Sequence, residues 1–301
     1  MEENKRNIAS NEIDILEIFH ILWKGKFKIV SLTLLFAIGS IYYALSIPNQ
    51  YTATAVFSPS KSSNSSLSSS MGQLGGLASL TGVNLGNGEA SDSMIALEIM
   101  QSWSFIEKFI SKNNLSIDLH AAKGWDKKTN ELVINNDIYN INTNKWVEAP
   151  PRSWNLFQSF SGMLNVSNNR DTGLITISIE YFSPYIAKEW LDLFVQEINS
   201  YMQKREMNDV NRNLEYLNNE IDGIVNAEMR QVFYTLIKEQ EKNKMLVSAN
   251  PEYALKSVNP SMIPDEKSQP RRSIICIGIT LFGLFFSVLL VLVMHYSRRI
   301  V

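Results

Sequence analysis

The chain has 301 residues, a formal net charge of −2 and 45% apolar residues. This balance gives no sign of the clustered basic surface that nucleic-acid binding needs, so we expect no nucleic-acid partner. The apolar residues concentrate in two blocks, and the sequence between them is polar and long enough to bury a core of its own. The single cysteine, Cys276, lies in the second block and excludes an intramolecular disulfide.

The first apolar block, residues 29–47, contains no charged residue. About 20 apolar residues cross the hydrocarbon core of a bilayer as a helix, so the block predicts transmembrane helix 1. A cleaved signal peptide is the alternative, supported by the small residues Ala44 and Ser46. Residues 1–28 argue against it, because so long a segment with five acidic side chains is atypical of a signal peptide.

Basic residues give the first block a direction. Lys24, Lys26 and Lys28 abut its start, and residues 48–60 after it carry none. Because Lys and Arg favour the cytoplasmic side, residues 1–28 are predicted to be a cytoplasmic segment.

Residues 48–272 are then predicted to form a periplasmic α/β domain. Segments with the alternation and composition of strands are expected to share a small mixed sheet at the membrane-proximal base. These are residues 51–57, 163–166, 174–181 and 252–258. The Ser/Gly-rich residues 58–88 and the polar residues 123–130 have the composition of loops.

A long helical stalk is expected over about residues 184–247, opened by Pro184. A narrow apolar stripe along it is broken at Gly223, which predicts a kink or a hairpin tip. The stripe consists of Val210, Leu214, Leu217 and Ile221 before the break and Val225, Met229, Val232 and Leu236 after it. A narrow stripe on so long a helix needs a partner. Residues 224–247 folding back and the same helix of a neighbouring subunit both remain open, so the first four residues are predicted oligomer or hairpin contacts.

A proline-rich connector, with Pro260, Pro264 and Pro270, leads into the second apolar block, residues 273–296. Proline stiffens this connection, and we expect Pro264 and Pro270 to set how the domain joins the helix. The block predicts transmembrane helix 2, because a buried core helix is rarely apolar all round over such a length. Two crossings make residues 297–301 a cytoplasmic tail.

Small residues repeat along one side of each apolar block, and small residues allow helices to approach closely in lipid. In the first they are Thr33, Ala37, Ser40 and Ala44, and in the second Cys276, Thr280, Gly283 and Ser287. We hypothesise that these stripes face each other or a partner helix, with Gly278 and Gly283 controlling the packing. Chance spacing is the alternative.

The sequence offers little catalytic chemistry. The three histidines, His20, His120 and His295, fall in separate regions and indicate no metal site. No phosphate-binding loop, serine elbow or cysteine nucleophile is present, and nothing selects a carboxylate pair. We expect no enzyme activity, no metal and no cofactor.

Taken together, these segments resemble the Wzz-type polysaccharide co-polymerases, the O-antigen chain-length regulators, over nearly the whole chain. No single motif is decisive; the order and spacing of all of them carry the resemblance. The segments are residues 13–18 with Leu22, Trp23 and Lys24; residues 48–53; residues 179–221 with Ser183, Pro184, Ala187, Ile198, Asn199, Tyr216 and Leu217; residues 236–240 and 244–246; and residues 254–260 with the prolines that follow.

The resemblance implies an α+β membrane protein, with two transmembrane helices flanking a periplasmic domain that bears a long protruding helix or helical hairpin. It implies a ring-shaped homo-oligomer in the inner membrane of a Gram-negative bacterium. Beside the O-antigen polymerase, this scaffold would set the length of the growing lipid-linked polysaccharide without making or breaking a bond. Two departures are that residues 184–247 are short for an O-antigen regulator and that no cytoplasmic kinase domain is present.

Two alternatives keep the same architecture but change the role. In the first, the same scaffold serves enterobacterial common antigen, capsule or exopolysaccharide instead of lipopolysaccharide O-antigen. A protein of another class, a structural adaptor of an export machine, would also place a domain between two membrane helices.

Overall fold

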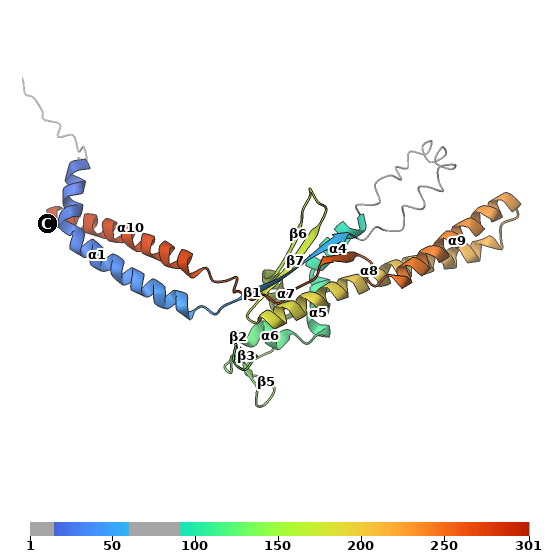
Figure 1. The fold of residues 1–301 in the computed structure, drawn as a ribbon, viewed down its shortest axis with the longest axis horizontal. Helices are drawn as coiled ribbons and strands as arrows, with labels where there is room; N and C mark the ends of the chain where they lie inside the picture. Colours follow the sequence, from blue (N-terminus) through green and yellow to red (C-terminus); the bar gives the residue numbers. More distant parts are fainter. Residues whose placement is uncertain (1–14, 60–90, 301) are drawn as a thin grey trace, which may run out of the picture. The chain divides into compact units, whose positions relative to one another are not determined.

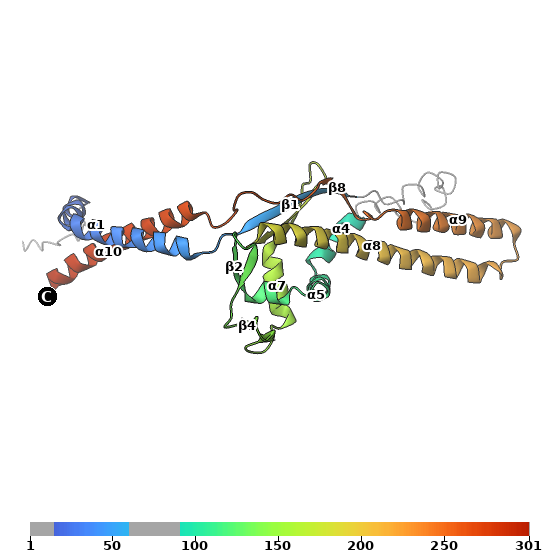
Figure 2. The ribbon, with the colours of Figure 1, turned by 60° about the horizontal axis from the view of Figure 1, so that its bottom comes forward.

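The computed structural model describes residues 15–59 and 91–300, drawn in two orientations in Figures 1 and 2. It divides into two compact units, one formed by Met1–Asn49 with Gln269–Val301 and the other by Gln50–Ser268. The expected loop over residues 58–88 lies outside the described residues from residue 60 onward, as do residues 1–14 of the expected cytoplasmic segment.

The first unit is a pair of helices, α1 (Ile15–Ser46) and α10 (Arg272–Ile300), which lie side by side in both views (Figures 1 and 2). The stretches His20–Ser46 and Arg272–His295 are long and apolar enough to cross a bilayer. Only 11% and 17% of the residues in their most apolar windows are buried in the protein. A core helix of a soluble protein would be mostly buried, so this exposure makes both helices candidate membrane spans.

The second unit is built on a four-stranded sheet in the order β6-β7-β1-β8. The strands are β1 (Tyr51–Pro59), β6 (Leu164–Asn168), β7 (Ile175–Tyr181) and β8 (Leu255–Asn259). The expectation that the four predicted strands share one sheet is confirmed, but the expectation of a mixed sheet is wrong. β7 and β8 run in the same direction, yet β1 lies between them and pairs antiparallel with both. Every neighbouring pair is therefore antiparallel.

The β6–β7 hairpin owes its turn to Asn169 and Gly173. The Asn169 side-chain oxygen accepts hydrogen bonds from the backbone N–H groups of Asp171 and Thr172 at 3.0 and 3.2 Å. Gly173 has a φ of +67°, which a residue without a β-carbon adopts at no steric cost. The predicted strands over residues 163–166 and 174–181 thus pair as a hairpin.

The core lies between the sheet and the helices α4 (Ser91–Gln101), α5 (Trp103–Lys112), α6 (Ser116–Ala121), α7 (Ser153–Met163) and the first half of α8 (Pro184–Ile221). Alternate residues of β1 and β7 point into it, as the period of a strand requires. Phe194 of α8 is its centre, with ring centroids 5.1 Å from Phe109 and 5.5 Å from Phe160. Such edge-to-face and tilted contacts stabilise aromatic cores beyond area burial alone.

Two small hairpins, β2–β3 and β4–β5, stand beside this core. Their strands are β2 (Ala122–Asp126), β3 (Glu131–Ile134), β4 (Tyr139–Asn140) and β5 (Lys145–Trp146). The expected loop over residues 123–130 is therefore wrong in its first half. The ring of Trp125 contacts the rings of Tyr51 and Tyr185, so tertiary packing holds a strand that its polar sequence does not indicate.

The long helix α8 (Pro184–Ile221) and α9 (Ala227–Ala249) form an antiparallel hairpin, visible in Figures 1 and 2. Pro184 stands in the first turn of α8, and the Ser183 hydroxyl caps it by accepting from the Ile186 N–H. At the tip, the Asn226 side chain caps α9 by accepting from the N–H groups of Glu228 and Met229. Of the two open alternatives, residues 224–247 therefore fold back within the same chain.

Asn199, in the buried half of α8, holds the start of β8. Its side-chain oxygen accepts from the N–H groups of Ala254 and Leu255, both at 2.9 Å, and its amide donates to the Leu255 carbonyl at 3.1 Å. One turn further, the Gln203 amide donates to the carbonyls of Val247 and Asn250. These two side chains tie the end of the hairpin and the returning strand to α8.

We predict that Asn199→Ala lowers the free energy of unfolding by about 2–4 kcal/mol, because it leaves three buried backbone groups without partners. Asn208→Ala is the matched control, since Asn208 is exposed on the same helix; it should change the free energy by less than about 0.5 kcal/mol. Thermal unfolding of the detergent-solubilised chain, followed by circular dichroism, measures both. Equal midpoints for the two variants would contradict the role of Asn199.

Candidate functional site

The inner seam of the α8–α9 hairpin contains the apolar residues predicted on α8. Val210, Leu214, Leu217 and Ile221 are exposed by only 1%, 5%, 9% and 9%. On α9 the least exposed apolar side chains are Phe233, Ile237 and Val247. The α8 stripe is thus used within the chain, along a seam that ends at the hydrogen bond from Asn243 to Glu206.

The residues expected to continue the α8 stripe lie at the hairpin tip (Val225) and on α9 (Met229, Val232 and Leu236). Val225, Met229, Val232 and Leu236 are exposed by 94%, 52%, 43% and 40%, so these four residues do not supply the stripe that covers α8 within the hairpin. The physical reason is that the helix breaks after Ile221 and restarts at Ala227 under its own cap, which resets the face turned to α8. Met229, Val232 and Leu236, here called the α9 outer row, form an apolar stripe that no element among the described residues covers.

The helix pair brings the two small-residue stripes together. Ser40, Ala44, Gly283 and Ser287 are buried between α1 and α10. The hydroxyls of Thr33 and Ser287 lie 3.4 Å apart, and the Cys276 thiol lies 3.8 Å from the Ser40 carbonyl. Ala37 and Thr280 are half-buried on the same faces.

The two glycines of α10 differ in their surroundings. A β-carbon on Gly283 would lie 2.5 Å from the β-carbon of Phe36, so this glycine permits the close approach of the helices. A β-carbon on Gly278 would meet nothing within 4 Å, and Gly278 is exposed. The structure therefore brings Gly283, but not Gly278, to the α1–α10 contact.

The connector is held by serines as well as stiffened by prolines. Pro260 is exposed, Pro264 half-buried and Pro270 buried after a cis peptide bond. The Ser261 hydroxyl donates to the Asp192 carboxylate. The Ser268 N–H and hydroxyl both donate to the Gln50 carbonyl, and the hydroxyl also lies 3.1 Å from the Glu180 carboxylate. Sequence reasoning missed these anchors, because serine in a proline-rich stretch is typical of any loop.

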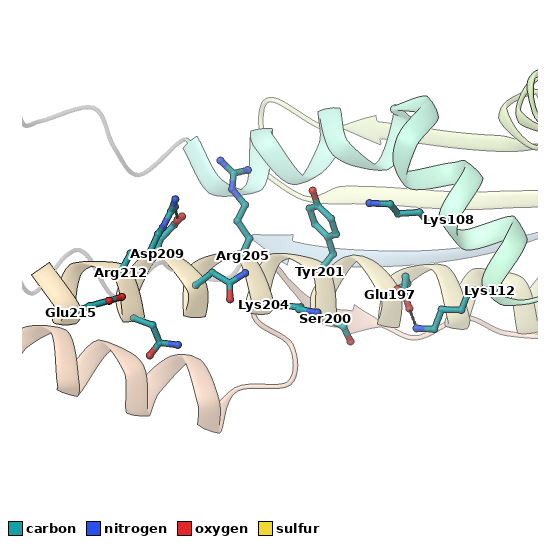
Figure 3. Close-up of a pocket in the computed structure, with 12 residues that line it drawn as sticks. Lys108, Lys112, Glu197, Ser200, Tyr201, Lys204, Arg205, Asp209, Arg212 and Glu215 are labelled. Atoms are coloured by element: carbon teal, nitrogen blue, oxygen red, sulfur yellow. Dashed lines mark hydrogen bonds and ion pairs between the residues drawn. The ribbon is translucent and has the colours of Figure 1, made fainter.

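A polar groove of about 1140 Å³ runs along α8 beside α5 (Figure 3). Lys108 and Lys112 come from α5, and the other lining residues lie between 197 and 215 on α8. In the close-up, Tyr201 and Arg205 rise from α8 on the side of Lys108 (Figure 3). We call this feature the basic groove, because five of its twelve lining side chains are basic and three are acidic.

Two ion pairs neutralise part of the basic groove. Lys112 pairs with Glu197, and Arg212 pairs with Asp209. Within the described part of the chain, Lys108 and Arg205 make no ion pair within 4.0 Å. The groove therefore presents free cations beside the hydroxyl and amide groups of Ser200, Tyr201 and Asn208, a donor set that suits an anionic or hydroxyl-rich ligand.

One carboxyl group outside the groove has a perturbed acidity. Burial raises the pKa of Asp118, and the nearby charge of Glu189 raises it further. Burial also raises the pKa of Tyr181, whose hydroxyl donates to the Asp118 backbone carbonyl at 2.7 Å. Neither Asp118 nor Tyr181 lines the basic groove, so the two residues are a feature of the core edge. Over residues 15–59 and 91–300, no group of three or more His, Cys, Asp or Glu side chains is placed to hold a metal ion.

Comparison with known proteins gives one sequence match and several structural ones. Residues 11–113 match the family described as Wzz, chain length determinant protein. No curated protein matches the sequence. A full-length bacterial polysaccharide co-polymerase aligns with a TM-score of 0.44 and 13% identity, over 95% of this chain and 99% of that one. A fragment of the co-polymerase WzzB from Salmonella Typhimurium aligns at 0.32 and 10% identity, over 73% of this chain and 100% of that one.

A mutant of the lipopolysaccharide O-antigen chain-length regulator WzzBSF from Shigella flexneri aligns with a TM-score of 0.28 and 10% identity, over 73% of this chain and all of that one. The sequence match covers α1, β1, α4 and α5. It includes the first apolar helix and the strand at the centre of the sheet.

We predict that Gly283→Ala separates α1 from α10, because the new methyl group clashes with Phe36. Gly278→Ala adds the same methyl group in open space, so it should keep the contact and gain slightly in helix propensity. Ser40→Cys supplies a partner for Cys276 across the helix contact. Each glycine change is combined with Ser40→Cys, the protein is mildly oxidised, and maleimide labelling under denaturing conditions counts the thiols that remain free. The thiols of Cys276 and of the introduced cysteine should stay free with Gly283→Ala and form a disulfide with Gly278→Ala. The same labelling in both would contradict the packing role of Gly283.

Proposed function

We propose, from the match of residues 11–113 to the Wzz chain length determinant family, that this protein regulates the chain length of the O-antigen of lipopolysaccharide. It would do so as a self-assembling co-polymerase in the inner membrane, beside the polymerase that makes the polymer. The observation that carries the proposal is the family match. The two apolar helices and the α/β unit between them in sequence support it.

The proposed topology follows the distribution of basic residues. Residues 1–28 would lie in the cytoplasm, residues 29–47 and 273–296 would cross the membrane, and residues 48–272 would face the periplasm. Lys24, Lys26 and Lys28 support this direction, because positive charge is retained on the cytoplasmic side. Residues 297–301 would return to the cytoplasm.

Self-assembly is proposed to use the α9 outer row. A row of three large apolar side chains on an exposed helix face is costly in water and is covered in an oligomer at little conformational cost. The inner seam of α8 is already filled within the hairpin, so it is not free for a neighbouring subunit. Gly278, which is exposed on α10, would belong to a contact between subunits in the membrane.

The polysaccharide is proposed to contact the basic groove. Sugar hydroxyls pair with amide, hydroxyl and cationic donors, and acidic sugars gain from Lys108 and Arg205. This contact needs no chemistry on the polymer, in keeping with a regulator that makes and breaks no bond. Enterobacterial common antigen, capsule and exopolysaccharide offer the same groups, so the surface polymer itself must be analysed to separate them.

We predict that Val232→Glu abolishes assembly while leaving the subunit folded, because it places a charge in the α9 outer row at a position that is 43% exposed. Gln231→Glu is the control, because it adds the same charge at the neighbouring exposed position. Both variants are expressed in a strain lacking the protein, and chemical cross-linking in membranes reports subunit number. The lipopolysaccharide banding pattern reports function.

Gln231→Glu should restore the native cross-linked size and the native modal length. Val232→Glu should yield monomers and the dispersed pattern of the deletion strain. If deletion of the protein leaves lipopolysaccharide banding unchanged, the O-antigen role is wrong; a changed capsule or common antigen would then assign the same scaffold to that polymer. A loss of export without a change in length would favour the structural adaptor.

We predict that Lys108→Gln combined with Arg205→Gln shifts the modal length but preserves the cross-linked oligomer, because it removes two cations from the basic groove. Lys238→Gln combined with Lys242→Gln removes the same charge from exposed positions of α9 and should leave the length unchanged. The measurement is the same banding pattern. An equal shift from both pairs would show that net charge, and not the groove, sets the length.

A further inference from the structure

The start of α1 presents its lysines to two different environments. Lys24 and Lys28 line a cavity of about 150 Å³ between α1 and α10, whose other walls include Ile21, Val291 and Met294. The two lysines are four residues apart and so share one face of the helix. The α10 side of this cavity is apolar apart from His295.

A second, larger groove adjoins this cavity. It has a volume of about 480 Å³, and Lys28 and Val291 line both. Its other walls are mainly apolar: Phe27, Leu32, Leu35 and Leu290, with Ser31 and Ser287. A basic opening therefore continues into an apolar channel along the helix pair.

Lys26 lies between these lysines in sequence but not in space. Its ammonium group sits 4.7 Å from the ring centroid of Trp23 and 5.5 Å from that of Phe27, and it lines neither groove. The attraction of the cation to the aromatic face accounts for this position. The chain thus contains a lysine of the same charge, two positions from Lys24 and from Lys28, that does not line the grooves.

The close approach of the helices forms the floor of the cavity. A β-carbon on Gly25 would lie 2.5 Å from a Val291 methyl group, so the helices touch here, backbone against side chain. Neither groove is lined by Asp or Glu, so nothing on these walls neutralises Lys24 and Lys28. Two cations above an apolar channel match a molecule with an anionic head and a hydrocarbon tail.

We propose that the two adjoining grooves bind one anionic phospholipid, with its phosphate between Lys24 and Lys28 and an acyl chain along Phe27, Leu32, Leu35 and Leu290. The inference requires the helix pair to lie in a membrane, but it does not depend on the proposed role in polysaccharide length. Basic pockets between transmembrane helices recognise lipid head groups in this way.

The test is native mass spectrometry of the full chain in mild detergent, titrated with phosphatidylglycerol or with phosphatidylcholine of the same acyl chains. Lys24→Gln and Lys28→Gln should each weaken phosphatidylglycerol binding about fivefold, the effect expected for one lysine near a lipid surface. Lys26→Gln should change it less than twofold. The wild-type protein should prefer phosphatidylglycerol. Equal weakening by all three substitutions, or equal binding of the two lipids, would overturn the proposal.

A second pair of variants tests the acyl channel without altering charge. Leu32→Trp fills the larger groove and should weaken binding, whereas Leu34→Trp, at an exposed position outside both grooves, should not. Inorganic phosphate at the same concentration should not displace the lipid; displacement would reassign the site to free phosphate. Circular dichroism of each variant confirms that α1 and α10 remain helical, so a loss of binding reports the site and not the fold.

Discussion

The carboxamide of Asn199 joins the middle of α8 to the start of β8, and the layout of the larger unit depends on this contact. The first half of α8 is fixed by its aromatic packing in the core. The hydrogen bonds of Asn199 therefore determine where the chain returns to the sheet after the α8–α9 hairpin. β8 then lies beside the edge of β1 that β7 does not occupy, and the two strands pair antiparallel. Because the backbone groups that it binds are buried, water cannot replace the amide. Loss of the amide therefore costs the full desolvation free energy of these groups.

The same return divides α8 into two parts with different partners. Up to Met202 its apolar face belongs to the core, and from Val210 to Ile221 it belongs to α9. α9 is a single short layer over α8, so only one of its faces can be covered within the chain. Met229, Val232 and Leu236 stay exposed, because no element in residues 15–59 or 91–300 covers them. The proposed self-association would bury this surface, which the hairpin itself creates.

Much of this arrangement is readable from local sequence, because periodicity and capping act over a few residues. Pro184 after Ser183 marks the start of α8, and Asn169 with Gly173 marks the hairpin turn. The sequence does not predict which face of α9 packs against α8. The rotation of α9 about its axis depends on the backbone geometry of the tip before Asn226. The order of the strands could not be predicted from the sequence either, because β1 pairs with β7 and β8, which lie more than a hundred residues away in the chain. The basic groove needs α5 beside α8, which no spacing reveals.

In the helix pair, small side chains determine both the contact and the spaces beside it. Gly283 against Phe36 and Gly25 against Val291 bring two helices close, and larger residues on either side then cannot interdigitate fully. The flanking grooves are therefore a consequence of close packing rather than a defect in it. A lipid that fills them contacts both helices at once, so its binding stabilises the paired state over the separated one. The anionic lipid content of the membrane would then act on the same contact that Gly283 makes possible.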